Sequence, residues 1–210
     1  YSTFVSGTTG KITNLKYGKL SLSQTVDTSK PLLIQNTNDP FLDFSQSTFL
    51  SGRHNLNIKR DFIFTIICNQ EGANVNQRQN FGLLSSDKCY FSMILSPNSV
   101  NVTVDSTVPL PSTPNVTKST NNLNAFRLIT VTYINGVINV YQNNSILSNG
   151  GTIYSCATTP LYNNIILNGR GDGENKLNKY KHFSVRSEAD LTSFNVSTYN
   201  QSIMTKYSIT

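Results

Sequence analysis

The chain has 210 residues, and charged residues make up only 13% of it, about half the roughly 25% usual for soluble domains. Glutamate occurs three times, alanine four times and tryptophan not at all, a composition that excludes a helical bundle or coiled coil. The formal net charge is +6, and 37% hydrophobic with 10% aromatic residues suffice to bury a core, which argues against a disordered chain.

The first third of the chain predicts short strands. Alternating apolar residues indicate strands over 18–24, 31–35 and 41–44, and residues 1–17 are expected to form an irregular N-terminal extension. Residues 61–69 (DFIFTIICN) are apolar on both faces, which is typical of a central strand covered on both sides. A further strand is predicted over 80–85.

Residues 90–105 predict a hairpin. Its first arm places Phe91, Met93 and Leu95 on one face, and its second arm returns with Val100, Val102 and Val104. This register points Asn101 and Thr103 outward, as an accessible N-glycosylation sequon at Asn101 requires. Residues 105–124 hold three prolines and no periodicity, so we expect a long surface loop there.

A second hairpin is predicted over 124–144. Asn135-Gly136 is the preferred pair for a two-residue turn, because both positions need a positive φ. The turn pairs Ile134 with Val137, Tyr133 with Ile138 and Val131 with Val140. One face then carries Ile129, Val131, Tyr133, Ile138 and Val140. The other carries Thr130, Thr132, Asn139 and Tyr141.

The last third predicts two strands and a helix. Strands are expected over 163–168 and 180–186, and in the second Phe183 and Val185 point inward, leaving Tyr180 and His182 outside. A helix is predicted over roughly 188–204, with Asp190 as its cap and Leu191, Phe194 and Thr198 as an apolar stripe. Ten or so short antiparallel strands describe an all-β, two-sheet sandwich.

Charge and cysteine usage limit the partners. The basic residues are scattered, so we expect no nucleic-acid partner. Their densest run is Lys176, Lys179 and Lys181, flanked by Arg170 and Arg186. The three cysteines, Cys68, Cys89 and Cys156, match no zinc spacing, and their odd number leaves at least one thiol free. Cys68 lies in an apolar run and is expected to be buried.

Membrane insertion is not expected, because no stretch reaches the roughly 18 apolar residues of a span. The chain starts at Tyr1, which suggests a processed form or an excised domain. Sequons are weak indications of a secreted protein in a chain so rich in asparagine, serine and threonine. They occur at Asn101, Asn115, Asn143, Asn195 and Asn200.

The order of these segments resembles a known family. Residues 30–50 (KPLLIQNTNDPFLDFSQSTFL) resemble the early segment of concanavalin A-like, laminin-G-like jelly rolls, and 61–69 resemble the core strand that follows. The hairpin 124–144 and the ending 163–201, a strand, a glycine-rich loop, a last strand and a short helix, are also similar. The resemblance implies one antiparallel jelly-roll sandwich spanning 1–210, with a concave sheet, variable loops and one short C-terminal helix. Members of the superfamily bind glycans or proteins, cleave polysaccharides or build structures, so the resemblance does not fix a function.

Catalytic chemistry finds little support in the sequence. Retaining glycoside hydrolysis needs two carboxylates about 5 Å apart, and the glutamates fall in predicted loops or at a helix start. Residues 199–201 (Tyr-Asn-Gln) superficially resemble the last motif of the lyases on this fold, but the partner Gln-x-His is missing. The two histidines, His54 and His182, are read as surface or rim residues. We therefore expect no enzyme and no cofactor.

Metal and adhesion sites are open alternatives. Calcium on related lectins is bound by loop oxygens, and Asp43, Asp105 and Asp172 are separated in the sequence, so no metal site is assigned. Arg170, Gly171 and Asp172 spell a short adhesion tripeptide in a glycine-rich loop. The alternative is that these glycines serve only the turn.

Glycan binding requires aromatic faces for stacking and polar groups for hydroxyls. The candidates on the side predicted to be exposed are Tyr141, Tyr154, Tyr162 and Tyr180, with Asn139, although each tyrosine is also a candidate for rim packing. The sequence thus predicts a non-enzymatic surface recognition module, lectin-like or receptor-binding, of a viral or cell-surface attachment protein. Its partner is a glycan or a host or neighbouring protein.

The alternative role is a structural coat, spike or decoration domain with homo-oligomer or virion contacts. A polysaccharide-cleaving enzyme is the minority alternative. An extracellular or virion-surface location suits all three readings.

Overall fold

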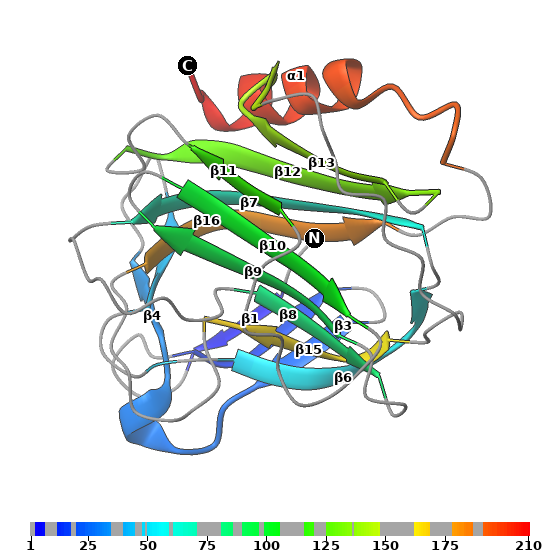
Figure 1. The fold of residues 1–210 in the computed structure, drawn as a ribbon. Helices are drawn as coiled ribbons and strands as arrows, with labels where there is room; N and C mark the ends of the chain where they lie inside the picture. Colours follow the sequence, from blue (N-terminus) through cyan, green and yellow to red (C-terminus); the bar gives the residue numbers. More distant parts are fainter. Residues whose placement is uncertain are drawn as a thin grey trace.

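The computed structural model consists of two antiparallel sheets with a helix against one of them (Figure 1). It describes residues 3–6, 12–17, 20–34, 40–44, 48, 50–58, 61–70, 81–85, 90–96, 99–105, 116–119, 125–135, 137–147, 162–168, 178–186 and 191–210. The predicted all-β sandwich with one short C-terminal helix is confirmed.

The first sheet has nine strands. In spatial order they are β1 (Thr3–Ser6), β2 (Ile12–Tyr17), β3 (Leu20–Ser23), β6 (Leu50–Ile58), β15 (Tyr162–Leu167), β8 (Phe81–Ser85), β9 (Tyr90–Ser96), β10 (Ser99–Asp105) and β11 (Val116–Ser119). Two expectations are corrected here. The described residues of 1–17 form strands β1 and β2 rather than an irregular extension, and β11 lies within the segment expected to be a loop.

The second sheet has seven strands. In spatial order they are β14 (Ser145–Ile146), β13 (Val137–Gln142), β12 (Arg127–Ile134), β7 (Phe62–Gln70), β16 (Asn178–Arg186), β5 (Phe41–Phe44) and β4 (Leu32–Ile34). Strand β7 lies at the centre, and every residue from Phe62 to Asn69 is buried. The prediction of a central strand covered on both faces is confirmed.

Both predicted hairpins are confirmed. Strands β12 and β13 pair Ile134 with Val137 and Val131 with Val140, and Asn135 has a φ of 51°. Gly136 lies outside the described residues. Strands β9 and β10 pair Leu95 with Val100, as the second hairpin requires.

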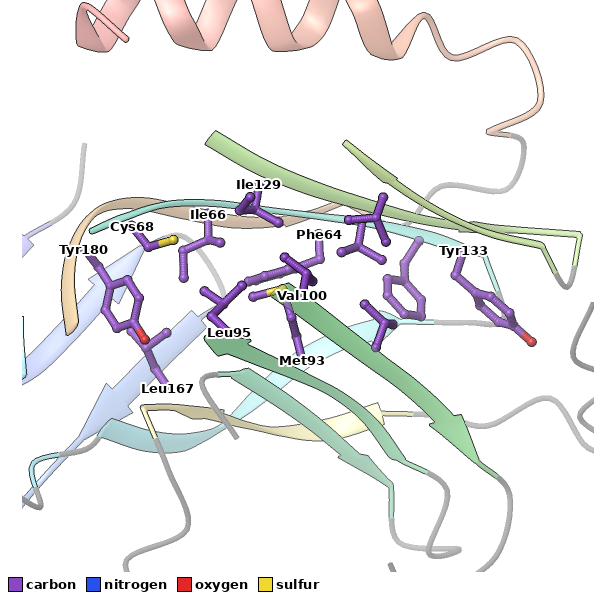
Figure 2. Packing of buried hydrophobic residues seen from close by; sticks show 14 of the residues in the cluster. Phe64, Ile66, Cys68, Met93, Leu95, Val100, Ile129, Tyr133, Leu167 and Tyr180 are labelled. Atoms are coloured by element: carbon purple, nitrogen blue, oxygen red, sulfur yellow. The ribbon is translucent and has the colours of Figure 1, made fainter. Parts of the chain in front are cut away.

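The core lies between the two sheets (Figure 2). Alternate residues of each strand enter it, such as Phe64 and Ile66 of β7 and Met93 of β9. Each fully buried side chain of this size contributes about 1.5–3 kcal/mol. Two aromatic pairs lie at the ends of the core: Phe44 packs against Tyr180 with ring centroids 5.1 Å apart, and Phe62 against Tyr133 at 5.6 Å.

Helix α1 (Val196–Tyr207) covers the outer face of the seven-stranded sheet, the face turned away from the core (Figure 1). Its cap is Asn195, whose Oδ1 accepts a hydrogen bond from the Thr198 N–H at 2.9 Å, so the expectation that Asp190 caps a helix from about 188 is wrong. A second apolar cluster holds the helix and the tail on the sheet. Its buried members are Ile67, Leu128, Ile203 and Ile209.

The tail after α1 is fixed to the hairpin β12–β13. Arg127 Nη1 donates to the Thr210 carbonyl at 3.0 Å, and Asn143 Nδ2 donates to the same oxygen at 2.9 Å. In the part of the chain that the structure describes, no helix is both long and apolar enough to span a membrane.

Candidate ligand-binding face

A β-bulge in β16 decides which side chains reach the outer face. Tyr180 pairs with Cys68 and His182 pairs with Ile67, so Lys181 is an extra residue between them. Tyr180 and Phe183 consequently both face the core, while the bulged Lys181 and its neighbour His182 lie outward. Bulges of this kind re-aim side chains and are common next to functional sites.

The bulge corrects the prediction for Tyr180. A strict alternation placed Tyr180 outside with His182, but Tyr180 is 2% exposed and donates from its hydroxyl to Asn168 Oδ1 at 3.2 Å. Phe183 and Val185 pack against the core, as predicted. A tyrosine ring enclosed in this way offers no face on which a sugar stacks, so Tyr180 is removed from the candidate ligand-binding residues.

Four side chains meet on the outer face near the place where β16 pairs with β5. We call them the lysine–phenylalanine cluster: Phe41, Phe126, Lys179 and Lys181. The ring centroids of Phe41 and Phe126 are 5.8 Å apart. Lys181 Nζ lies 3.9 Å from the Phe126 centroid, and Lys179 Nζ lies 5.6 Å from the Phe41 centroid. All four side chains are half-buried, so each keeps part of its surface in solvent.

These contacts fit cation–π geometry. An ammonium within about 6 Å of a ring centroid is attracted to the ring face by about 0.5–1 kcal/mol at exposed sites. The stacking holds two flexible lysines in defined positions. Each ammonium group is therefore held over a ring, on a side chain that is half-buried at the outer face.

Asn69 lies beside the cluster. Its strand sends Phe64, Ile66 and Cys68 into the core, so Asn69 belongs to the outer face, where it pairs with Lys179. Asn69 is 8% exposed, and its Oδ1 has no hydrogen-bond partner among the described residues. Solvent does not reach this oxygen, so Asn69 is a buried neighbour of the cluster and not part of its accessible surface.

A row of hydroxyl-bearing residues crosses the same face beneath α1. Ser184, Thr65, Thr130 and Tyr141 are register partners on four adjacent strands. Tyr199 bonds to Ser184 through their hydroxyl oxygens at 2.9 Å, and Asn200 Oδ1 accepts from Thr130 Oγ1 at 2.8 Å. The helix thus covers the polar middle of the sheet, including the part of β16 at His182 and Ser184.

His182 lies under the C-terminal end of α1. Its Nδ1 is 3.2 Å from the Tyr207 hydroxyl, and the two rings are 5.3 Å apart. Burial, and after it the charge of Lys206, lowers the pKa of His182 from 6.5 to about 4. His182 is therefore a neutral packing residue at neutral pH rather than an exposed rim histidine.

The other predicted ligand-binding residues are placed as follows. Tyr141 and Asn139 are half-buried on β13 and share the outer face, on the far side of α1 from the cluster. Burial raises the pKa of the Tyr141 phenol. Tyr162 belongs to β15 in the opposite sheet, and its side chain lies outside what the structure describes.

Two further predictions fall on residues outside the described ranges: the stacking residue Tyr154 and the adhesion tripeptide Arg170, Gly171 and Asp172. Among the described residues, no group of three or more histidine, cysteine or acidic side chains is arranged to hold a metal ion. Cys68 is buried in the core, and burial raises the pKa of its thiol to about 12. Its packing role was predicted from the apolar run and is confirmed.

Three sequon asparagines are buried or hydrogen-bonded within the fold. Asn101 lies on the face away from the core, as the register predicted, but it is only 6% exposed. Asn143 accepts from the Leu128 N–H at 3.1 Å through Oδ1, and its Nδ2 is bound to the tail. Asn200 is fully buried, whereas the cap residue Asn195 is exposed.

Sequence reasoning missed the lysine–phenylalanine cluster as a unit. The basic run at 176–181 was visible, but its stacking partners Phe41 and Phe126 come from segments far away in the chain. Only the pairing of β16 with β5 and β7 brings them together. The one available signal was two lysines flanking a tyrosine in a predicted strand.

No protein-family model matches the sequence, and no curated protein sequence matches it significantly. Solved structures do share the fold. Trypanosoma rangeli sialidase in complex with sialic acid superposes with a TM-score of 0.61 at 11% identity, covering 91% of this chain and 30% of the sialidase. The binding domain of botulinum neurotoxin serotype G superposes with a TM-score of 0.57 at 11% identity, covering 87% of this chain and 48% of that one.

At this identity the comparison shows the fold alone, a jelly-roll-like β-sandwich. The chain spans less than half the length of either protein.

Proposed function

We propose that this domain is a non-enzymatic recognition module that binds a glycan on an extracellular surface through the lysine–phenylalanine cluster. The observation that carries the proposal is the stacking of Lys181 on Phe126 and Lys179 on Phe41, which holds two ammonium groups at a solvent-accessible edge. Neighbours of the same fold include a toxin binding domain and a sialidase bound to sialic acid, which agrees with a recognition role.

The cluster has the make-up of a binding surface. Apolar rings supply contact area and the ammonium groups supply hydrogen-bond donors, a combination that small saccharide sites use. Half-burial also matters, because lysines already fixed by stacking lose less conformational freedom when a ligand binds.

A glycan array followed by titration calorimetry of each hit tests the proposal. Phe41→Leu and Phe126→Leu keep apolar volume but remove the rings that fix the lysines, and each is expected to weaken binding at least tenfold. Ile146→Ala, at the opposite edge on β14 where the side chain is 44% exposed, is the matched control and is expected to bind normally.

Three results would contradict the proposal. The first is a silent array together with self-assembly on a sizing column, which favours the structural role in a coat or spike. The second is turnover of a polysaccharide that is lost in Tyr199→Phe or His182→Ala, which favours an enzyme. The third is binding that all variants retain, which places the site elsewhere.

A further inference from the structure

We propose that the ligand of the lysine–phenylalanine cluster is an acidic saccharide, held by its carboxylate or sulfate groups. The inference rests on the proposed function and adds the chemical class of the ligand. It follows from the positive charges on the outer face of the seven-stranded sheet and from the positions of the two lysines over the rings of Phe41 and Phe126.

The outer face of the seven-stranded sheet is basic. Along β16 it carries Lys179, Lys181 and Arg186, and α1 adds Lys206. Asp43 on β5, the register partner of Lys179, is the one acidic residue within the described strands of this sheet and the helix over it, so the cations at this face outnumber the acids. The excess of positive charge at this face draws anions towards it.

The bulge creates this concentration of charge. In a regular strand Lys179 and Lys181 would share the outer face with Phe183, and Tyr180 with His182 would share the inner one. The extra residue keeps both lysines outward while it turns Phe183 inward. The fold thus gains an apolar core residue without moving a cation away from the face.

Each of the two rings has a lysine ammonium over one of its faces. The ammonium of Lys181 occupies one face of Phe126 at 3.9 Å, and Lys179 lies over Phe41. A neutral saccharide gains most by stacking its C–H face on a free ring, which these contacts oppose. An acidic saccharide gains instead from charge-assisted hydrogen bonds to the ammonium groups, which are roughly twice as strong as neutral ones.

The same geometry disfavours nucleic acid. Single-stranded nucleic acid is bound by stacking bases on aromatic side chains, and here lysines lie over the rings.

Length-matched probes test the inference by titration calorimetry at low and at physiological salt. They are hexagalacturonate, which carries carboxylates, a heparin-derived sulfated hexasaccharide, neutral maltohexaose and an oligodeoxynucleotide of six thymidines. At least one acidic hexasaccharide is expected to bind ten times or more tightly than maltohexaose, with an affinity that falls as salt rises.

Variants locate the binding. Lys179→Ala with Lys181→Ala is expected to lose at least tenfold in affinity for the acidic probe, and the double Lys→Arg variant is expected to retain most of it. The control is Lys16→Ala with Lys118→Ala, which makes the same charge change on β2 and β11 of the opposite sheet. Circular dichroism and a thermal melt confirm that each variant folds.

Each outcome decides one claim. Equal binding of maltohexaose and the acidic probes overturns the acidic class but leaves glycan recognition standing. No binding of any saccharide in this set or on the array overturns the proposed function itself. Tighter binding of the oligonucleotide, or an equal loss in the control double variant, overturns the assignment of a saccharide to these lysines.

Discussion

Protonation of His182 is expected to destabilise the folded protein as the pH falls. In the unfolded chain the imidazole takes up a proton near its ordinary pKa of 6.5, but in the folded protein only near 4. Between these values the unfolded state binds more protons, so the free energy of unfolding decreases as the pH falls. The contribution is fully present above pH 6.5 and lost by about pH 4.

The magnitude follows from the shift. Each pKa unit corresponds to 1.36 kcal/mol, so the shift from 6.5 to about 4 gives a loss of about 3 kcal/mol. Solvent at the exposed part of the ring screens the charge, which makes this value an upper limit. The effect should concentrate on the contact of β16 with the end of α1, where Tyr207 and Lys206 face the ring.

Urea denaturation between pH 7 and pH 4 measures the effect. Carboxylates also titrate in this range, so the test is the difference between the wild type and His182→Gln, which removes the titrating ring. The wild type should lose up to about 3 kcal/mol more than the variant. In Lys206→Gln the His182 pKa should rise towards 6.5, and the extra loss should shrink.

Proton NMR supplies the direct check, because the chain has only two histidines. A His182 signal that titrates near 6.5 would refute the reasoning, since it would show that α1 does not cover the ring. Parallel acid profiles for the wild type and His182→Gln would refute it independently.

Three further predictions concern buried groups. Asn200→Ala should cost about 1–2 kcal/mol in urea denaturation, because the buried Thr130 hydroxyl loses its acceptor; an unchanged midpoint would contradict the helix contact. Tyr180→Phe should cost about 1 kcal/mol by removing the hydrogen bond to Asn168 while keeping the ring in the core, and a neutral result would place the hydroxyl in solvent. In a Cys89→Ser, Cys156→Ser background, the Cys68 thiol should resist a thiol reagent such as DTNB at pH 8 in the folded protein and react once urea unfolds it. The reason is that burial holds the thiol protonated. Rapid labelling of the folded protein would contradict the burial of Cys68.

The strands were predictable wherever two local signals agreed. In the hairpin around Asn135 the turn residues and the alternation fixed the same register, and the structure reproduces it pair by pair. The central strand at 61–69 was identified because it is apolar on both faces. The burial of Thr130 and Thr132 was not predictable, because alternation gives no sign that α1 covers their face.

The incorrect predictions arose because the deciding contacts are not visible in a local sequence pattern. A period of two cannot represent the extra residue in β16, so Tyr180 was assigned to the wrong face. The start of the helix was placed at Asp190 because both Asp190 and Asn195 are good capping residues, and packing of the helix on the sheet selects the second. The lysine–phenylalanine cluster depends on contacts between positions 41, 126 and 179–181, which no local pattern contains.

The bulge in β16 makes the strand sensitive to length rather than to composition. Residues before Lys181 and residues after it follow opposite odd–even rules, so a single-residue deletion between them would put the two halves in phase. A related chain with such a deletion at Lys181 would form a regular strand that keeps both Tyr180 and Phe183 in the interior, and it would lose one lysine from the outer face. Among relatives, a gap at this position is therefore expected to leave the core unchanged and to coincide with a changed lysine–phenylalanine cluster.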